Sequence, residues 1–131
     1  MGYGQVTHCS NCNDEQECTL GAGMAFGDLF NVIDNFPKGA QNKIKFISSL
    51  HEIEQQDLSY EVFECRQCDT SHSRLHLTIK YDGKKRFSPN YRCSECKHKL
   101  FRSNRLLTNF KCRKCKKYAL QNSKVSSILW D

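Results

Sequence analysis

The 131-residue chain has no long apolar run and no secretory leader pattern. Its apolar stretches fall well short of the roughly 20 residues that a membrane-spanning helix needs, so no membrane association is expected. The N-terminus has no basic region followed by an apolar segment, which leads us to expect an intracellular, cytoplasmic location. In such a reducing compartment, clustered cysteines indicate metal ligands more often than disulfides.

Familiar catalytic motifs are also missing. The sequence contains neither the HExxH of zinc proteases nor the Gly-x-Ser-x-Gly of serine hydrolases. Residues 21–27 are glycine-rich, but they lack the Gly-Lys-Ser/Thr of a P-loop, and no long apolar strand precedes them as a dinucleotide-binding fold requires. We interpret this stretch as a turn into a helix, and we predict that the protein is not an enzyme.

Acidic residues are scarce in the second half of the chain. Residues 1–65 carry a net charge of −7 and residues 66–131 one of +13, which together give the overall charge of +6. A basic part joined to an acidic part suggests a polyanionic partner for the basic one.

Cysteine, by contrast, is abundant and ordered. Eight of the nine cysteines form four CxxC pairs, which we call knuckles 1 to 4: Cys9/Cys12, Cys65/Cys68, Cys93/Cys96 and Cys112/Cys115. Two knuckles can close a tetrahedral Cys₄ site with no open position, as a structural zinc requires. We therefore predict two Cys₄ sites and two Zn²⁺ ions. Iron could occupy such sites, and a redox function would need a strand–CxxC–helix context that is not evident.

The spacing of the knuckles favours one pairing without excluding another. Knuckles 3 and 4 are separated by 15 residues, a spacing typical of a zinc site, so we expect them to share one ion. Knuckles 1 and 2 would then share the other. The alternative joins knuckle 2 to knuckle 3 and knuckle 1 to knuckle 4, which would bring the two ends of the chain together.

The remaining thiol and the nearby histidines are not predicted to be ligands. Cys18 is interpreted as a spare, partly buried thiol. His8, His72 and His98 lie beside knuckles, but eight cysteines already complete two sites.

Apolar spacing predicts a helical hairpin near residues 24–56. Apolar residues recur at helical spacing over 24–36 and again over 40–56. Pro37 is expected to end the first helix, with residues 38–39 at the corner.

From residue 59 the pattern changes to that of strands. Residues 59–65 and 74–81 alternate, Asp82-Gly83 predicts a turn, and short strands are expected to enter the later knuckles. The apolar tail, 122–131, is expected to dock on the core. The expected fold is a small α+β protein with two zinc sites on short antiparallel strands and an inserted helical hairpin. We expect residues 1–83 to hold the first site, and 84–131 to form a basic ribbon with the second.

The later knuckles resemble a known fold. CSECK (93–97) with FKCRKCK (110–116) resembles the zinc ribbon, a small β fold of the rubredoxin-like Cys₄ group. MGYG, CSNC and LGAG near the start, with SILWD at the end, resemble small bacterial zinc-ribbon proteins. The ribbon resemblance covers residues 91–118 well, and 9–12 and 59–82 less closely. It implies zinc binding, but zinc ribbons serve in transcription, translation, nucleic-acid handling and protein docking.

One feature departs from the usual zinc-ribbon knuckle. A glycine commonly follows the second cysteine, whereas this chain has Asn13, Asp69, Lys97 and Lys116 there. Asn and Asp tolerate a left-handed backbone, and Lys does so less readily.

The basic residues around knuckles 3 and 4 suggest nucleic-acid binding, DNA or RNA, through phosphate contacts. The candidates are Lys84, Lys85, Arg86, Lys97, Lys99, Arg102, Lys111, Arg113, Lys114, Lys116 and Lys117. Four interleaved aromatics could stack on bases or fill the core: Tyr91, Phe101, Phe110 and Tyr118. The alternative function is a protein-interaction module or small regulator, whose basic face would dock an acidic protein.

Overall fold

The computed structural model describes residues 2–22 and 29–130, which form an antiparallel sheet with one α-helix. The strand order is β5-β4-β3-β2-β1-β7, and β6 pairs with β3 off this path. The helix, α1, spans Lys38–Leu50. The strands are β1 Gly2–Cys9, β2 Glu15–Gly21, β3 Ile53–Cys65, β4 Thr70–Tyr81, β5 Lys85–Phe87, β6 Leu100–Arg102 and β7 Leu120–Trp130. The predicted α+β class is confirmed in this outline.

The hairpin of β3 and β4 forms where the alternating pattern predicted strands. Leu75, Leu77 and Ile79 are buried on one face of β4, as the period of two requires. The predicted turn is confirmed: Asp82 and Gly83 adopt φ angles of 49° and 74°, and β5 then pairs back on β4. The strands are longer than expected, since β3 has 13 residues and β4 has 12.

The predicted helical hairpin is only half present. Its second helix is α1, whose Ile44 and Ile47 are buried. Pro37 was expected to end the first helix, but it stands at the start of α1. Proline suits a helix start because no backbone N–H is needed there. In place of the first helix, two short 3₁₀ turns, Leu29–Asn31 and Ile33–Asn35, bring the apolar side chains onto the core. Residues 24–28 of that prediction lie outside the described residues.

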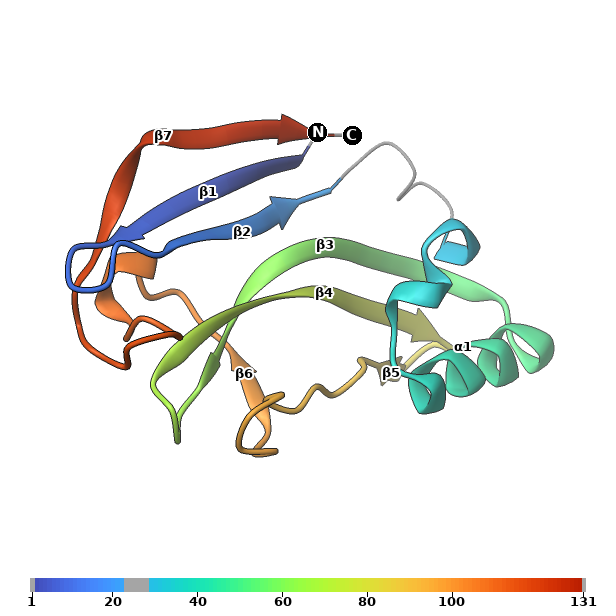
Figure 1. Ribbon diagram of the computed structural model, residues 1–131. Helices are drawn as coiled ribbons and strands as arrows, with labels where there is room; N and C mark the ends of the chain where they lie inside the picture. Colours follow the sequence, from blue (N-terminus) through green and yellow to red (C-terminus); the bar gives the residue numbers. More distant parts are fainter. Residues whose placement is uncertain (1, 23–28, 131) are drawn as a thin grey trace.

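Three strands were not predicted, β1, β2 and β7. In β2, Gln16, Cys18 and Leu20 are buried in alternation, a pattern that the polar composition of the segment concealed. The tail forms β7, which pairs along β1 with Gly2 opposite Trp130. The first and last strands therefore lie side by side (Figure 1). Among the other expected short strands, only the one at β6 forms, while residues 107–109 make a 3₁₀ turn.

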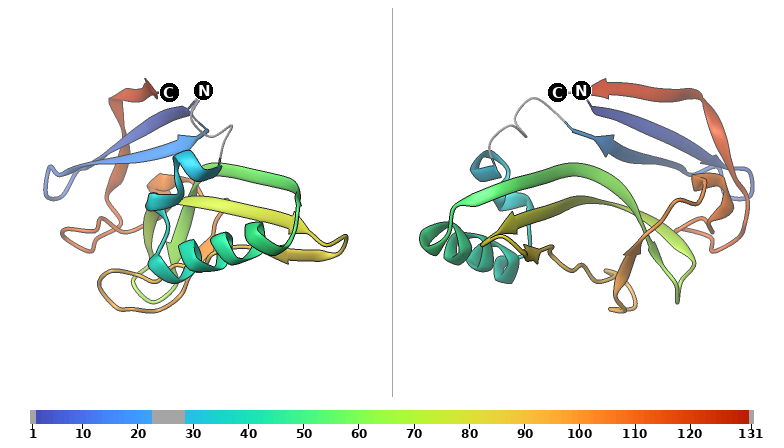
Figure 2. Two further views of the ribbon diagram at one scale, coloured as in Figure 1. Left: turned by 90° about the vertical axis from the view of Figure 1, so that its right-hand side faces the viewer. Right: turned by 180° about the vertical axis from the view of Figure 1, so that it is seen from behind.

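Two main cores lie under this sheet. The larger joins β3, β4, α1 and the 3₁₀ turns, and the smaller contains Phe110 and Leu120 between the first and last strands. Figures 1 and 2 show α1 at one end of the molecule and the knuckle turns towards the other. Within the described residues, no helix has the length and apolar character needed to cross a membrane.

Candidate metal centres

The strands place each knuckle at a turn. Knuckle 1 joins β1 to β2, and knuckle 2 joins β3 to β4. Knuckle 3 leads into β6, and knuckle 4 into β7. Such turns leave the cysteine sulfurs free to point towards a common centre.

The eight predicted ligands converge in two groups of four. Site A contains Cys9, Cys12, Cys112 and Cys115, and site B contains Cys65, Cys68, Cys93 and Cys96. Within each group, the four sulfurs all lie within 4.8 Å of one another. The preferred pairing was therefore wrong, and the alternative is the one that forms. Each site takes one knuckle from residues 1–83 and one from 84–131, so the assignment of one site to each part was also wrong.

Strand pairing gives the physical reason for this arrangement. The strand that leaves knuckle 3, β6, pairs with the strand that enters knuckle 2, β3, and sets Cys65 opposite Leu100. In the same way β7, which leaves knuckle 4, pairs with β1 and sets Cys9 opposite Leu120. A spacing of 15 residues permits knuckles 3 and 4 to share an ion, but the long-range strand pairs bring each to a different partner.

All four knuckles share one backbone geometry. The residue after the second cysteine is left-handed in each, with φ angles of 61° at Asn13, 56° at Asp69, 65° at Lys97 and 63° at Lys116. Its N–H donates to the carbonyl oxygen of the first cysteine, over N–O distances of 2.8 to 3.0 Å. The two lysines therefore adopt the conformation that glycine usually supplies.

We expect Lys97→Gly to stabilise the metal-loaded protein. A left-handed conformation costs a non-glycine residue about 1–2 kcal/mol, and the greater freedom of glycine in the unfolded chain offsets about half of that. The expected gain is therefore about 0.5–1 kcal/mol, read from denaturant unfolding.

Lys99→Gly is the matched control for this change. It removes the same charge from an extended position that bridges to Arg92, so it should destabilise the protein. A loss of stability in Lys97→Gly would mean that the contact of the Lys97 ammonium with the Ser94 carbonyl oxygen, at 3.1 Å, outweighs the backbone strain.

The sulfurs are close without being bonded. Sγ–Sγ distances are 3.5 Å for Cys9–Cys115, 3.6 Å for Cys12–Cys112 and 3.3 Å for Cys65–Cys96, all far beyond the length of a disulfide. These contacts join one knuckle to the other within each site. The arrangement suits four thiolates around one metal ion.

The pKa values of the thiols depend on hydrogen bonds, burial and the neighbouring thiols. A hydrogen bond from the Asn11 side chain is the main cause that lowers the pKa of Cys115 to about 6. Burial raises the pKa of Cys93, but the backbone N–H groups of Cys96 and Glu95 and the nearby thiols outweigh it and lower the pKa to about 7. The neighbouring Cys96 thiol, followed by burial, raises the pKa of Cys68 to about 12. Four thiolates cannot gather without a compensating cation, and a metal ion provides one.

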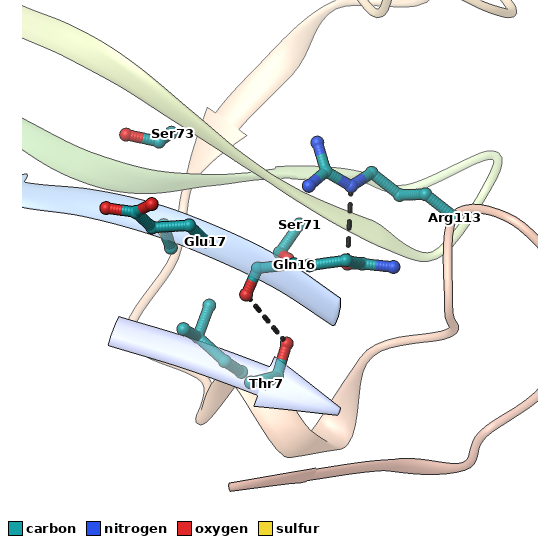
Figure 3. Close-up of a pocket in the computed structure, with 8 residues that line it drawn as sticks. Thr7, Gln16, Glu17, Ser71, Ser73 and Arg113 are labelled. Atoms are coloured by element: carbon teal, nitrogen blue, oxygen red, sulfur yellow. Dashed lines mark hydrogen bonds between the residues drawn. The ribbon is translucent and has the colours of Figure 1, made fainter. Parts of the chain in front are cut away.

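The first cysteine of each knuckle is buried and the second is half-buried. At site A, the Gln16 amide donates to the Cys112 sulfur at 3.4 Å and accepts from the Arg113 guanidinium at 3.3 Å. Figure 3 shows Arg113 reaching over Gln16 beside a small pocket of about 10 Å³, no larger than one water molecule.

Cys18 belongs to neither site, as predicted. It is buried in β2, with 8% of its surface exposed, and it packs with Leu20 and Leu107. Burial raises the pKa of its thiol. Among the described histidines none joins a cysteine group, although Nε2 of His72 lies 4.0 Å from the Cys93 sulfur.

The two sites meet through residues that adjoin their ligands. Asp69, next to Cys68, accepts hydrogen bonds from the Tyr118 hydroxyl at its side chain and from the Lys111 N–H at its carbonyl oxygen, the latter at 2.9 Å. Glu95, next to Cys96, pairs with the Lys116 ammonium at 2.6 Å. Sequence reasoning missed these contacts: Asp69, Lys111, Lys116 and Tyr118 were considered for other roles, and Glu95 was not considered, although each lies within or beside a knuckle.

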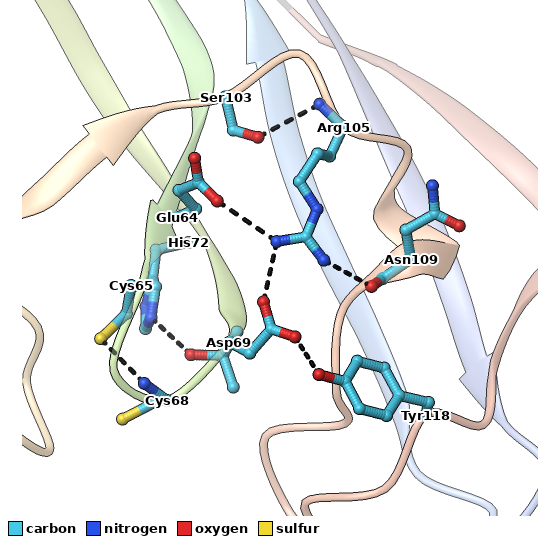
Figure 4. Close-up of polar contacts among 10 residues, drawn as sticks. Glu64, Cys65, Cys68, Asp69, His72, Ser103, Arg105, Asn109 and Tyr118 are labelled. Atoms are coloured by element: carbon cyan, nitrogen blue, oxygen red, sulfur yellow. Dashed lines mark hydrogen bonds and ion pairs between the residues drawn. The ribbon is translucent and has the colours of Figure 1, made fainter.

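Arg105 completes the polar network around Asp69 (Figure 4). Its guanidinium lies 2.8 Å from an Asp69 oxygen and 3.2 Å from a Glu64 oxygen, and it donates to the Asn109 carbonyl oxygen at 2.7 Å. The hydrogen bond from Arg105, followed by that from Tyr118, lowers the pKa of Asp69 and keeps its carboxylate charged.

The predicted basic residues do not form one surface. Lys84, Lys85 and Arg86 lie at the far end of β4, about 36 Å along the strand from knuckle 2. Lys85, Arg102 and Lys116 are paired with carboxylates. Within the described part of the chain, the others around knuckles 3 and 4 have no carboxylate partner: Lys97, Lys99, Lys111, Arg113, Lys114 and Lys117.

The aromatics are mostly structural. Phe110 is fully buried and Tyr91 is 7% exposed, so both fill cores. The Arg66 guanidinium covers the Phe101 ring at 3.9 Å. Only Tyr118 of the four is largely exposed, at 62%, and the Lys111 ammonium lies 5.3 Å from its ring centre.

An open groove of about 420 Å³ lies between the two sites. Its charged lining is mixed, because both acidic and basic side chains from the start of β2, from knuckles 3 and 4 and from β4 contribute. The charged residues are Asp14, Glu15, Arg74, Glu95, Arg113 and Lys114.

The zinc-ribbon resemblance therefore holds at the level of two ribbon-like cysteine sites. The chain as a whole departs from a simple ribbon, since each site joins knuckles that are far apart in the sequence. Comparison of the chain with protein-family models, with curated proteins and with solved structures gave no match.

Proposed function

We propose that the protein is a non-enzymatic two-zinc protein that binds nucleic acid through the surface of knuckles 3 and 4. Zinc suits sites A and B because a tetrahedral ion with Zn–S bonds of about 2.3 Å needs sulfurs about 3.8 Å apart. The closest sulfurs, at 3.3 to 3.6 Å, need to move by only a few tenths of an ångström. Four cysteines leave no open position, which supports a structural role.

The observation that carries nucleic-acid binding is the set of exposed cations without carboxylate partners. Knuckles 3 and 4 adjoin one another through the Glu95–Lys116 pair, so their cations belong to one region. Arg113, Lys114 and Lys117 are exposed there. Such cations can contact phosphates and release counterions.

Backbone contact is favoured over base stacking. Single-strand binders combine cations with several exposed aromatic faces, and here Tyr118 alone among the four candidates is largely exposed. We therefore expect duplex and single-stranded nucleic acids to bind with similar affinity.

The mixed groove between the sites favours a second candidate function. Its acidic and basic side chains could pair with complementary charges on a protein surface. A protein partner would bind with a weaker salt dependence than nucleic acid, because fewer counterions are released.

We expect Lys114→Ala/Lys117→Ala to weaken nucleic-acid binding and to lower the slope of log K against log salt by about 2. Fluorescence anisotropy of the zinc-loaded protein with labelled duplex and single-stranded DNA and RNA, over a salt series, measures both. The charge-matched control is Lys84→Ala/Arg86→Ala in the distant β4–β5 hairpin, which should leave the slope unchanged. Absence of binding by the unmodified protein at low salt would reject this function and direct the search to protein partners.

A further inference from the structure

The strongest unexplained feature is that both knuckles of site B hold the same knuckle of site A. Knuckle 2 contributes Asp69 and knuckle 3 contributes Glu95. Both bind the segment 111–118, which carries knuckle 4, through hydrogen bonds or an ion pair. These three contacts form no part of either cysteine cluster. They do not use the side chains of Arg113, Lys114 and Lys117, the exposed cations of the proposed nucleic-acid surface.

The contacts lie very close to the ligands in sequence. On the site B side, Asp69 follows Cys68 and Glu95 precedes Cys96. On the site A side, Lys116 follows Cys115, and Lys111, whose N–H binds the Asp69 carbonyl oxygen, precedes Cys112. The Asp69–Lys111 backbone hydrogen bond and the Glu95–Lys116 ion pair therefore each join two residues that are sequence neighbours of predicted ligands.

The backbone of Asp69 and of Lys116 has little conformational freedom relative to the adjacent cysteines. Asp69 and Lys116 are the left-handed residues of their knuckles, and their N–H groups bind the carbonyl oxygens of Cys65 and Cys112. A knuckle that is ordered by its metal ion thus holds its contact residue in place. A knuckle that is disordered would release it.

We propose that sites A and B bind metal cooperatively, with Asp69 and Glu95 as the positioning residues that couple them. Metal at site B orders both residues, which then hold knuckle 4 in the form that site A requires. By thermodynamic linkage, metal at site A must strengthen binding at site B by the same factor. Coupling of this kind commonly amounts to roughly tenfold in affinity. The proposal rests on metal occupancy of both sites, and it is independent of nucleic-acid binding.

The variant Glu95→Gln/Tyr118→Phe tests the coupling while it retains all eight ligands. It removes the Lys116 ion pair and the hydroxyl bonded to Asp69, and it leaves the left-handed residues unchanged. Asp82→Asn is the control, because it breaks the exposed Lys85 pair in the distant hairpin, and Asn tolerates the left-handed φ of 49°.

Zinc titration of the reduced apo-protein against a competing chelator, followed by native mass spectrometry, measures the populations with zero, one and two ions. We expect the unmodified chain and Asp82→Asn to pass from zero to two ions with a clearly smaller one-ion population than two independent sites of equal affinity would give. In Glu95→Gln/Tyr118→Phe the one-ion species should accumulate, and the affinity for the second ion should fall roughly tenfold.

Two results would overturn the coupling. Accumulation of the one-ion species by the unmodified protein would show independent sites, while the proposed two-zinc function would stand. Identical titrations of the double variant and the unmodified protein would show that the side-chain contacts of Glu95 and Asp69 with knuckle 4 do not couple the sites. A chain that binds no zinc would instead reject the proposed function itself.

Discussion

Replacing Cys93 with serine is expected to unfold the larger part of the protein and to reduce its zinc content from two ions to at most one. Cys65 and Cys93 of site B are buried in the larger core with Leu75 and Leu77. A structural zinc contributes on the order of 10 kcal/mol to folding. Because a domain of this size has a net stability of only about 5–15 kcal/mol, loss of this ion removes most of it.

Circular dichroism and zinc analysis of purified Cys93→Ser check this prediction. Cys18→Ser is the matched control, since Cys18 is also buried but lies outside both sites. It should keep two ions and lose about 1 kcal/mol, the effect of a polar atom in an apolar setting. If Cys93→Ser kept a native spectrum and both ions, site B could not be the structural centre described above.

Replacing Cys9 with serine is expected to have a more local effect. Site A holds only the smaller core, which contains Phe110 and Leu120, and it joins the first strand to the last. The first part of the sheet connects to β3 through a single paired position, Gly21 opposite Tyr60. With so few shared backbone contacts, β1, β2 and β7 can open while β3 and β4 remain paired.

Hydrogen exchange of Cys9→Ser, followed by mass spectrometry of peptides, distinguishes local opening of β1, β2 and β7 from unfolding of the whole sheet. We expect protection to fall by several orders of magnitude in β1 and β7, since loss of about 10 kcal/mol exceeds the stability of that region. Peptides from β3 and β4 should exchange almost as slowly as in the unmodified protein. Loss of protection throughout the chain would mean that the sheet unfolds as one unit.

Local pattern accounts for much of what was predicted correctly. The alternation of residues 74–81 and the Asp82-Gly83 turn specified β4 and its hairpin, because side-chain period and turn preference act over a few residues. The helical spacing of Ile44 and Ile47 specified α1 in the same way. The prediction of the first helix was wrong. Its apolar residues reach the core from two 3₁₀ turns, so packing on the core determined their conformation more than their helical spacing in the sequence did.

The sequence by itself identified the eight cysteines that could hold metal ions, since CxxC holds two sulfurs on one turn whatever the rest of the chain does. Only the tertiary structure decided which knuckles meet. Pairing of β6 with β3 and of β7 with β1 spans dozens of residues, and no local pattern encodes such a contact. Tertiary structure likewise divided the basic residues between two distant regions and brought Asp69 and Glu95 to knuckle 4. Ligand identity is a property of short segments, whereas ligand partnership depends on how the whole sheet is assembled.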